Sequence, residues 1–207
     1  MAVAKPKPKT ETDTASRILD VAERLVQVRG FNGFSYADVA EELHVTKASL
    51  HYHFAGKAEL GEALIGRYAS RFNDALDRIA AKPIDARAKL DAYARLYTDV
   101  LRNERMRLCG MLAAEYQTLP EPMRVAVLRF FDENEEWLAS VLEQGEREGS
   151  LKLAAPPTEV ARMIVSGLEG GMLVARTYGD LARFRASASR LIGSLTGSAP
   201  RGSSRSR

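Results

Sequence analysis

The sequence of 207 residues has few of the features that define several common classes of protein. It has one cysteine, so no disulfide bond can form within the chain, and we expect a protein of the reducing cytoplasm. No apolar run approaches the ~18 residues that a membrane-spanning helix needs. Lysines near the N-terminus are not followed by the apolar segment of a secretory signal. We therefore expect no membrane partner and no secretion.

The sequence also lacks the side-chain clusters of an enzyme. Its three histidines all lie between His44 and His53, and we find no nucleophile–base pair, metal-ligand cluster or phosphate-binding loop. His51 and His53 form a His-x-His pair, but residues two apart on a helix point about 200° away from each other. Such a pair does not share a metal ion readily. We therefore expect no enzyme activity, no metal and no cofactor.

Glycine and proline are few, with 15 and 8 residues, while alanine, leucine, arginine and glutamate are abundant. Helix-forming residues and an apolar fraction of 45% predict an all-α protein with a substantial core. The net charge is only +3, and residues 1–60 hold eight lysines and arginines against eight acidic residues. Overall charge therefore does not identify a nucleic-acid binder, and any basic surface must come from local arrangement.

Residues 14–54 predict three short helices. The first is expected over residues 14–29, with Thr14 as its N-cap and Gly30 as the left-handed residue that ends it. The second begins at Ser35, where Ser35 and Asp38 fit a capping box. With the turn at residues 44–46 and the third helix, these two helices form a helix-turn-helix arrangement.

The third helix is expected over residues 47–54, with Thr46 as its N-cap. Leu50 and Phe54 lie four residues apart and predict the face that packs on the core. No acidic residue occurs from His44 to Lys57, although carboxylates are spread through most of the remaining chain. A short helix rich in hydrogen-bond donors and free of carboxylates suits contact with phosphates and base edges.

Six further helices are expected. They cover residues 58–81, 84–103, 105–117, 120–148, 157–178 and 180–195. The sequence shows no internal repeat and no alternating pattern of a β-strand. The predicted organisation is a disordered basic arm at 1–12, a DNA-binding domain at 13–60, a helical effector and dimerisation domain at 61–195, and a disordered tail at 196–207. The arm is either a plain flexible terminus or an additional phosphate contact.

Residues 14–60 resemble the N-terminal DNA-binding domain of the TetR/AcrR family of bacterial regulators. The matching positions are Ile18-Leu19, Ala22, Leu25, Gly30-Phe31, Ser35, Asp38-Val39-Ala40, Val45-Thr46-Lys47, Leu50, His53-Phe54 and Lys57-Ala58-Glu59-Leu60. Two positions depart from the family pattern. His44 replaces the usual glycine of the turn, so a histidine must adopt its special backbone conformation. His51 stands where tyrosine is most frequent, and Tyr52 follows it.

The resemblance implies a homodimer that inserts two recognition helices into successive major grooves of a near-palindromic double-stranded operator. A small molecule in the C-terminal domain would release a repressor of this kind from DNA. The implied DNA contacts are Ser35, Thr46, Lys47, Ala48, Ser49, His51, Tyr52, His53 and Lys57. Thr46 and Lys47 would begin the recognition helix near phosphate. Ala48, Ser49 and Tyr52 are best placed for base edges, and the remaining contacts fall on phosphates.

An effector pocket is expected between the long helix after Lys57 and the helices that follow Pro83. Its candidate residues are Tyr68, Phe72, Tyr93, Tyr97, Cys109, Met111, Glu115, Trp137 and Met172. Aromatic walls would suit a hydrophobic or amphipathic effector. Glu115 either meets an internal arginine or marks a polar point of the pocket. Cys109 is either a small core residue or a thiol sensor whose pKa Arg107 lowers.

The last two helices carry apolar stripes that predict a four-helix dimer interface. The candidates are Ile164, Leu168, Gly171, Leu181, Phe184, Leu191 and Ile192. The alternative is that the same stripes pack within one chain. A third function class, an architectural DNA-binding protein without an effector, fits less well, because the C-terminal domain is larger than dimerisation requires.

Overall fold

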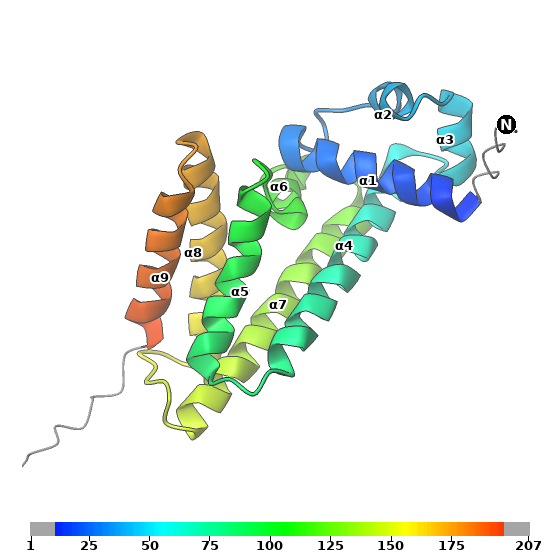
Figure 1. Ribbon diagram of the computed structural model, residues 1–207. Helices are drawn as coiled ribbons and strands as arrows, with labels where there is room; N and C mark the ends of the chain where they lie inside the picture. The colour runs from blue at the N-terminus through cyan, green and yellow to red at the C-terminus, as the bar shows by residue number, and fades with distance from the viewer. Residues whose placement is uncertain (1–10, 197–207) are drawn as a thin grey trace, which may run out of the picture.

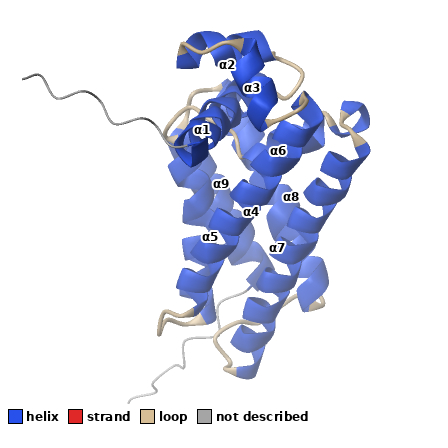
Figure 2. Cartoon of the chain, turned by 90° about the vertical axis from the view of Figure 1, so that its right-hand side faces the viewer, coloured by secondary structure: helices blue, strands red, loops and turns tan. Residues whose placement is uncertain are grey.

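The computed structural model describes residues 11–196, and this part of the chain folds into helices without a strand (Figure 2). The α-helices are α1 Glu11–Arg29, α2 Tyr36–Leu43, α3 Lys47–His53, α4 Lys57–Ala80, α5 Ala86–Leu101, α6 Leu108–Ala114, α7 Glu121–Arg147, α8 Pro157–Thr177 and α9 Leu181–Thr196. A 3-10 helix, Tyr116–Thr118, follows α6. The predicted all-α fold is confirmed. The predicted disordered ends fall outside the described residues, except that residues 11, 12 and 196 are helical.

Helices α1, α2 and α3 form a small domain at one end of the molecule, and α4 leads from it into a bundle of the remaining helices (Figure 1). Within the bundle α4 packs on α7, α7 on α8, and α8 on α9, with α5 in contact with α4, α7, α8 and α9. The short helix α6 lies between α1 and the bundle and also contacts α4 and α7. Among residues 11–196 no helix is long and apolar enough to cross a membrane.

Two predicted helices have the wrong boundaries: the first at its start and the one after residue 105 at both ends. The first helix starts at Glu11, so Thr14 lies inside it and is not its N-cap. Asp13 stands in the added turn, where a carboxylate interacts favourably with the helix dipole. The helix predicted over residues 105–117 is shorter, because Glu115 leaves the helical conformation with φ −105° and ψ 12°.

Buried polar groups in the bundle are satisfied where α5 meets α7. The Tyr93 hydroxyl donates to Asn134 Oδ1 at 3.2 Å, and Asn134 Nδ2 donates to the Phe130 carbonyl at 2.6 Å. Tyr93 also lies beside the Tyr97 hydroxyl at 3.3 Å and stacks on Trp137. Buried polar atoms are normally paired in this way, so exceptions elsewhere in the bundle call for an explanation.

Candidate functional site

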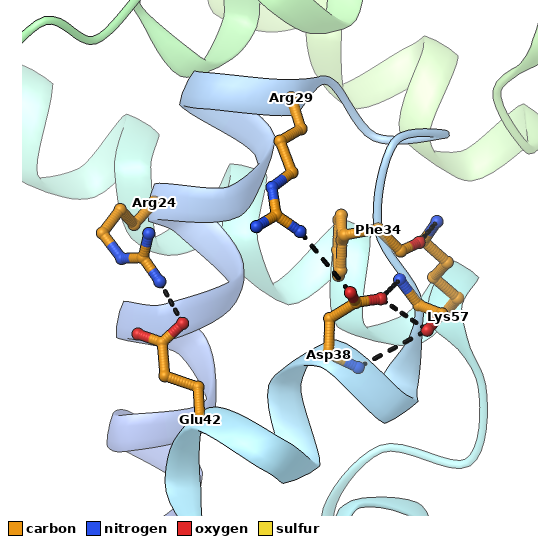
Figure 3. Close-up of polar contacts among 7 residues, drawn as sticks. Arg24, Arg29, Phe34, Asp38, Glu42 and Lys57 are labelled. Carbon is orange, nitrogen blue, oxygen red and sulfur yellow. Dashed lines mark hydrogen bonds and ion pairs between the residues drawn. The ribbon is translucent and has the colours of Figure 1, made fainter.

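The turn before α2 is built as the sequence predicts. The Ser35 side chain caps the helix at the Asp38 amide, and the Asp38 carboxylate accepts from the Ser35 amide at 2.7 Å. The bond from the Ser35 hydroxyl lowers the pKa of Asp38, with a further contribution from the Ser35 amide. Arg29 lies 3.4 Å from Asp38, and Arg24 pairs with Glu42 (Figure 3). Both acidic side chains of α2 drawn there are therefore paired with α1.

The turn between α2 and α3 places a histidine in the left-handed region. His44 has φ 54° and ψ 46°, which confirms the special conformation expected where the family usually has glycine. Its amide donates back to the Glu41 carbonyl, and the Val45 amide donates to the Ala40 carbonyl at 3.0 Å. Thr46 then caps α3 by accepting from the Ser49 amide at 3.2 Å. The turn is thus closed by local hydrogen bonds at both helix ends.

Helix α3 is anchored on one side and exposed on the other. Leu50 is fully buried, whereas Lys47, Ala48 and His51 are exposed and Tyr52 is 73% exposed. Ser49 and His53 are half-buried, and Ser35 is exposed next to Asp38. Lys47, Ala48, His51 and Tyr52 therefore share one exposed face of α3, and this face carries no carboxylate of its own, whereas Ser49 and His53 lie away from its centre. That is a surface suited to DNA.

His51 is held by its neighbours. Its Nδ1 lies 3.1 Å from the Ala55 carbonyl, which only accepts, so Nδ1 carries a proton. The ring packs 4.8 Å from that of Tyr36, whose hydroxyl donates to the Phe54 carbonyl at 3.0 Å. These contacts fix the orientation of the His51 ring at the end of α3.

Lys57 lies in a different place from the one predicted. Its ammonium donates to the Phe31 and Phe34 carbonyls and sits 4.6 Å and 4.4 Å from the centres of their rings. Burial lowers the pKa of Lys57, while the Glu115 and Asp38 carboxylates oppose that shift. Cation–π contacts and two carbonyls thus tie the start of α4 to the turn before α2. This placement favours a structural role over the predicted phosphate contact.

A second unusual arrangement lies inside the bundle, around an arginine that the sequence did not single out as a site. Arg107 precedes α6 and is 1% exposed. The centre of its guanidinium lies 4.0 Å from the Phe72 ring and 4.1 Å from the Tyr97 ring, with Phe130 at 5.5 Å. Glu169 of α8 is its ion-pair partner, with Oε1 at 3.5 Å from Nε. We call these five residues the Arg107 box.

The two charged groups of the Arg107 box lack hydrogen bonds, whereas the Tyr97 hydroxyl lies 3.3 Å from that of Tyr93. Neither the three guanidinium nitrogens of Arg107 nor the two carboxylate oxygens of Glu169 find a hydrogen-bond partner among the described residues. Burial raises the pKa of Glu169, and the charge of Arg107 opposes the shift. A Cβ at Gly110 would lie 2.3 Å from Glu169 Oε2, so glycine is what lets the carboxylate lie against α6.

Comparison with known proteins now decides the family. Residues 18–64 match the model for bacterial regulatory proteins of the tetR family, and residues 86–191 match the tetracyclin repressor-like C-terminal domain. The second match alone spans more than half of the chain. The chain belongs to the TetR family. It is therefore a transcriptional regulator with an N-terminal DNA-binding domain, and not an enzyme.

Relatives of the TetR family match along most of the chain. A regulator from Agrobacterium tumefaciens superposes with a TM-score of 0.87 at 29% identity, covering 91% of this chain and 100% of its own. One from Legionella pneumophila gives 0.76 at 31%, covering 94% and 100%. The biofilm operon negative transcriptional regulator IcaR of Staphylococcus aureus is 25% identical over 130 residues, which is 57% of this chain and 69% of the relative.

The residues predicted to line a TetR-family effector pocket are mostly core. Fully or largely buried are Tyr68, Phe72, Tyr93, Tyr97, Cys109 and Met172, and partly buried are Met111, Glu115 and Trp137. Phe72 and Tyr97 contribute to the Arg107 box, and Tyr93 packs on both of them. The predicted pocket thus coincides in part with the box, but its polar centre is Arg107.

Cys109 is unsuited to thiol sensing in this structure. It is fully buried, and burial raises the pKa of its thiol well above the usual range. The charge of Arg107 lowers that pKa, as the sequence suggested, but the effect of burial is larger. A thiol that stays protonated is a poor nucleophile, so the small-core interpretation is favoured.

Glu115 connects the two domains and is not a point in the pocket. Its carboxylate accepts from the Phe31 and Asn32 amides, the second at 3.1 Å, directly after the end of α1. Gly30 precedes them with φ 84°, and a Cβ there would lie 2.9 Å from Glu115 Oε2. Both sequence alternatives for Glu115 are therefore wrong, because backbone amides of the DNA-binding domain satisfy its charge.

Two more bonds reinforce this junction. The Met106 amide donates to the Gln27 carbonyl at 3.2 Å, and Arg176 of α8 donates to the Val28 carbonyl at 2.9 Å. The last turn of α1 and the residues directly after it are thus held by residues before α6, after α6 and in α8. A shift of α6 would be felt directly by the DNA-binding domain.

The predicted dimer stripe is largely wrong. Ile164, Leu168, Phe184 and Ile192 are at most 1% exposed, because α8 and α9 pack on each other and on α7 and α5. Gly171, Leu181 and Leu191 are only partly exposed. The alternative of intrachain packing holds for the four buried residues. The exposed apolar side chains of α8 are instead Met163, Leu173 and Val174, between 49% and 53% exposed.

Sequence reasoning missed Arg107 and misplaced Lys57. Arg107 directly precedes the apolar run Leu108–Ala114, and that position was the one available signal of burial. Lys57 follows Gly56, whose N-cap position provides no side-chain hydrogen bond for α4. The Lys57 ammonium comes close to the Phe31 and Phe34 carbonyls only after the chain has folded, so its sequence position does not reveal this contact.

Proposed function

We propose that this TetR-family regulator is a homodimeric repressor that leaves a two-fold symmetric operator when a small molecule binds its C-terminal domain. The observation that carries the proposal is helix α3, anchored by Leu50 and exposing an acid-free surface of Lys47, Ala48, His51 and Tyr52. Repression is supported by a relative named as a negative transcriptional regulator. The C-terminal domain exceeds what dimerisation needs, which supports a sensor.

The roles follow from position on α3. Thr46 and Lys47 stand at the N-terminus of α3. The positive end of the helix dipole and the Lys47 ammonium both attract a DNA phosphate there. Ala48 is exposed and small, so it permits close approach to a base edge beside Tyr52. His51 is exposed on the same face and contacts phosphate. Sequence preference then rests on Ala48, Ser49 and Tyr52.

Dimerisation is assigned to the outer faces of α8 and α9, with the residues revised from the sequence prediction. Met163, Gly170, Leu173 and Val174 lie along the exposed side of α8. A Cβ built on Gly170 would meet nothing within 4 Å, so another helix can approach closely there. Two such faces form a four-helix interface around a two-fold axis.

The direct test is a footprint of the purified protein on DNA upstream of its own gene. A repressor of this kind protects a two-fold symmetric site, with half-sites about one helical turn apart. Binding that depends on DNA length and protects no defined site would instead support the architectural alternative.

Replacing Lys47 with alanine is expected to weaken binding to all DNA sequences, roughly tenfold at moderate salt, because a phosphate contact is lost. The slope of log affinity against log salt concentration should become shallower by about 1. Fluorescence anisotropy over a salt series measures both. Lys152→Ala is the matched control, because Lys152 is exposed far along the chain beyond α7. An unchanged slope for Lys47→Ala would mean that another helix reads the DNA.

Replacing Leu173 with arginine is expected to break the dimer. A desolvated like charge on each side of the two-fold axis should raise the dimer dissociation constant roughly 30-fold or more. Sedimentation over a concentration series measures this. Val125→Arg is the control, because Val125 is 60% exposed on α7, outside the proposed interface. If only the Val125 variant dissociates, the interface is on α7.

A further inference from the structure

The Arg107 box holds a charge that the protein itself does not satisfy. Arg107 and Glu169 together bury five nitrogen and oxygen atoms without a hydrogen bond. The ion pair joins Arg107 Nε and Glu169 Oε1 at 3.5 Å, which is longer than a good charge-assisted hydrogen bond. Buried ionic groups with unsatisfied donors are costly. Nearby, Tyr93 and Asn134 are hydrogen-bonded, so the deficiency is local to the box.

The geometry of the box determines what can satisfy it. Phe72 and Tyr97, at 4.0 Å and 4.1 Å, cover the guanidinium from positions close enough for stacking. A guanidinium presents its N–H donors in its plane, in a fork that matches the two oxygens of a carboxylate. The surrounding rings favour a flat or apolar body attached to that group.

We propose that Arg107 is the recognition point for a small effector that carries one carboxylate on an aromatic or apolar body. The effector carboxylate takes the place of Glu169 beside the guanidinium and makes the bidentate contact that Glu169 lacks. This inference rests on the proposed effector-controlled function and names the chemical class of that effector.

Charge stays balanced in this exchange. The two carboxylate oxygens of Glu169 are buried, but its side chain as a whole keeps 16% exposure, so its stem lies at the edge of the bundle and the carboxylate can turn outward when another carboxylate arrives. One carboxylate then replaces another next to Arg107, and no additional buried charge is created. A neutral ligand cannot replace the Glu169 carboxylate in this way. A cationic ligand would have to compete with Arg107 for the same carboxylate.

The position of Arg107 explains how such binding would reach the DNA-binding domain. Arg107 is the N-cap residue of α6, and its neighbour Met106 is bonded to Gln27 near the end of α1. The other end of α6 carries Glu115, which holds the Phe31 and Asn32 amides. Because the box is closed, an effector must displace its walls, and α6 lies between those walls and α1.

The test is a set of carboxylic acids, each compared with its own primary amide. Acetate, octanoate, benzoate, phenylacetate and indole-3-acetate are added to the full-length protein without DNA, at constant ionic strength, and melting temperature and calorimetric affinity are measured. We expect at least one aromatic or longer-chain acid to bind saturably while its amide does not. No difference between any acid and its amide would overturn the proposal. If tetramethylammonium stabilised the protein and no acid did, the proposal would also be overturned, because the Arg107 box would then bind cations.

Two variants predict changes of opposite sign. Arg107→Met should abolish binding of the acid, whereas Glu169→Gln should strengthen it roughly tenfold or more, because the competing carboxylate is gone. Arg95→Met, an exposed arginine on α5, should change nothing. If Arg107→Met fails to fold, Glu169→Gln still tests the proposal. An unchanged or weaker affinity of that variant for the acid would contradict the replacement of Glu169 by the effector carboxylate.

These measurements use the protein free of DNA, so they are independent of the operator footprint. A symmetric footprint with no acid-specific binding leaves the repressor standing and removes the carboxylate effector. Acid-specific binding without a symmetric footprint supports the carboxylate effector and removes the repressor proposal.

Discussion

Replacing Leu50 with alanine is expected to release the recognition helix from the DNA-binding domain. Leu50 is fully buried and is the buried residue of α3, a helix of 7 residues. A helix that short is not stable alone, so its packing determines whether it forms. A buried leucine-to-alanine change costs about 2–5 kcal/mol, through lost burial and the cavity it leaves. Operator affinity should fall together with the free energy of unfolding.

Urea unfolding followed by circular dichroism, with operator binding by anisotropy, measures both effects. Leu128→Ala is the matched control, because Leu128 is 52% exposed on α7, and its effect on stability should stay within about 0.5 kcal/mol. If Leu50→Ala keeps wild-type stability and operator affinity, α3 is held by contacts other than its own apolar side chain. The Tyr36 hydroxyl bond to the Phe54 carbonyl would then be the next candidate.

Replacing Glu115 with glutamine is expected to loosen the junction between the DNA-binding domain and the bundle. The carboxylate accepts from two backbone amides, Phe31 and Asn32, and a glutamine amide can accept well from only one of them. Charge-assisted bonds of this kind are worth about 1.5–3 kcal/mol, less in a partly exposed site. Hydrogen exchange at the Phe31 and Asn32 amides should therefore accelerate about tenfold.

The same variant should weaken coupling between the domains, so that an acid which binds the bundle releases less DNA. Glu146→Gln is the control, because Glu146 is exposed near the end of α7. Unchanged exchange at both amides would show that Glu115 is dispensable and that other contacts, such as the bond from Asn32 Nδ2 to Thr118 Oγ1, hold the junction. Unchanged release with faster exchange would place the coupling in Arg176 and Met106.

Local chemistry explains why the DNA-binding domain was predictable. The capping box of Ser35 and Asp38, the N-cap at Thr46 and the left-handed Gly30 involve residues at most three or four apart. Each of these devices satisfies the ends of a helix with neighbours in the chain. Their spacing was therefore enough to give the helix order, the turn at His44 and the exposed face of α3.

Other features of the DNA-binding domain depended on contacts distant in sequence. Lys57 was predicted on phosphate, but its ammonium is taken by two carbonyls more than twenty residues earlier. Glu115 was predicted in a pocket, but it binds amides 83 and 84 residues away. A residue type predicts that a charge needs a partner, and only the fold determines which partner is near.

The sequence by itself determined the class of the protein: an all-α chain whose N-terminal helices read DNA, because caps, turns and apolar spacing act over a few residues. Tertiary structure decided which apolar stripe of α8 is core and which is exposed, because Leu168 and Leu173 are the same residue type and differ only in packing. It also decided the interior of the bundle. Arginine is normally a surface residue, and Arg107 is buried because the rings of α4, α5 and α7 close around it.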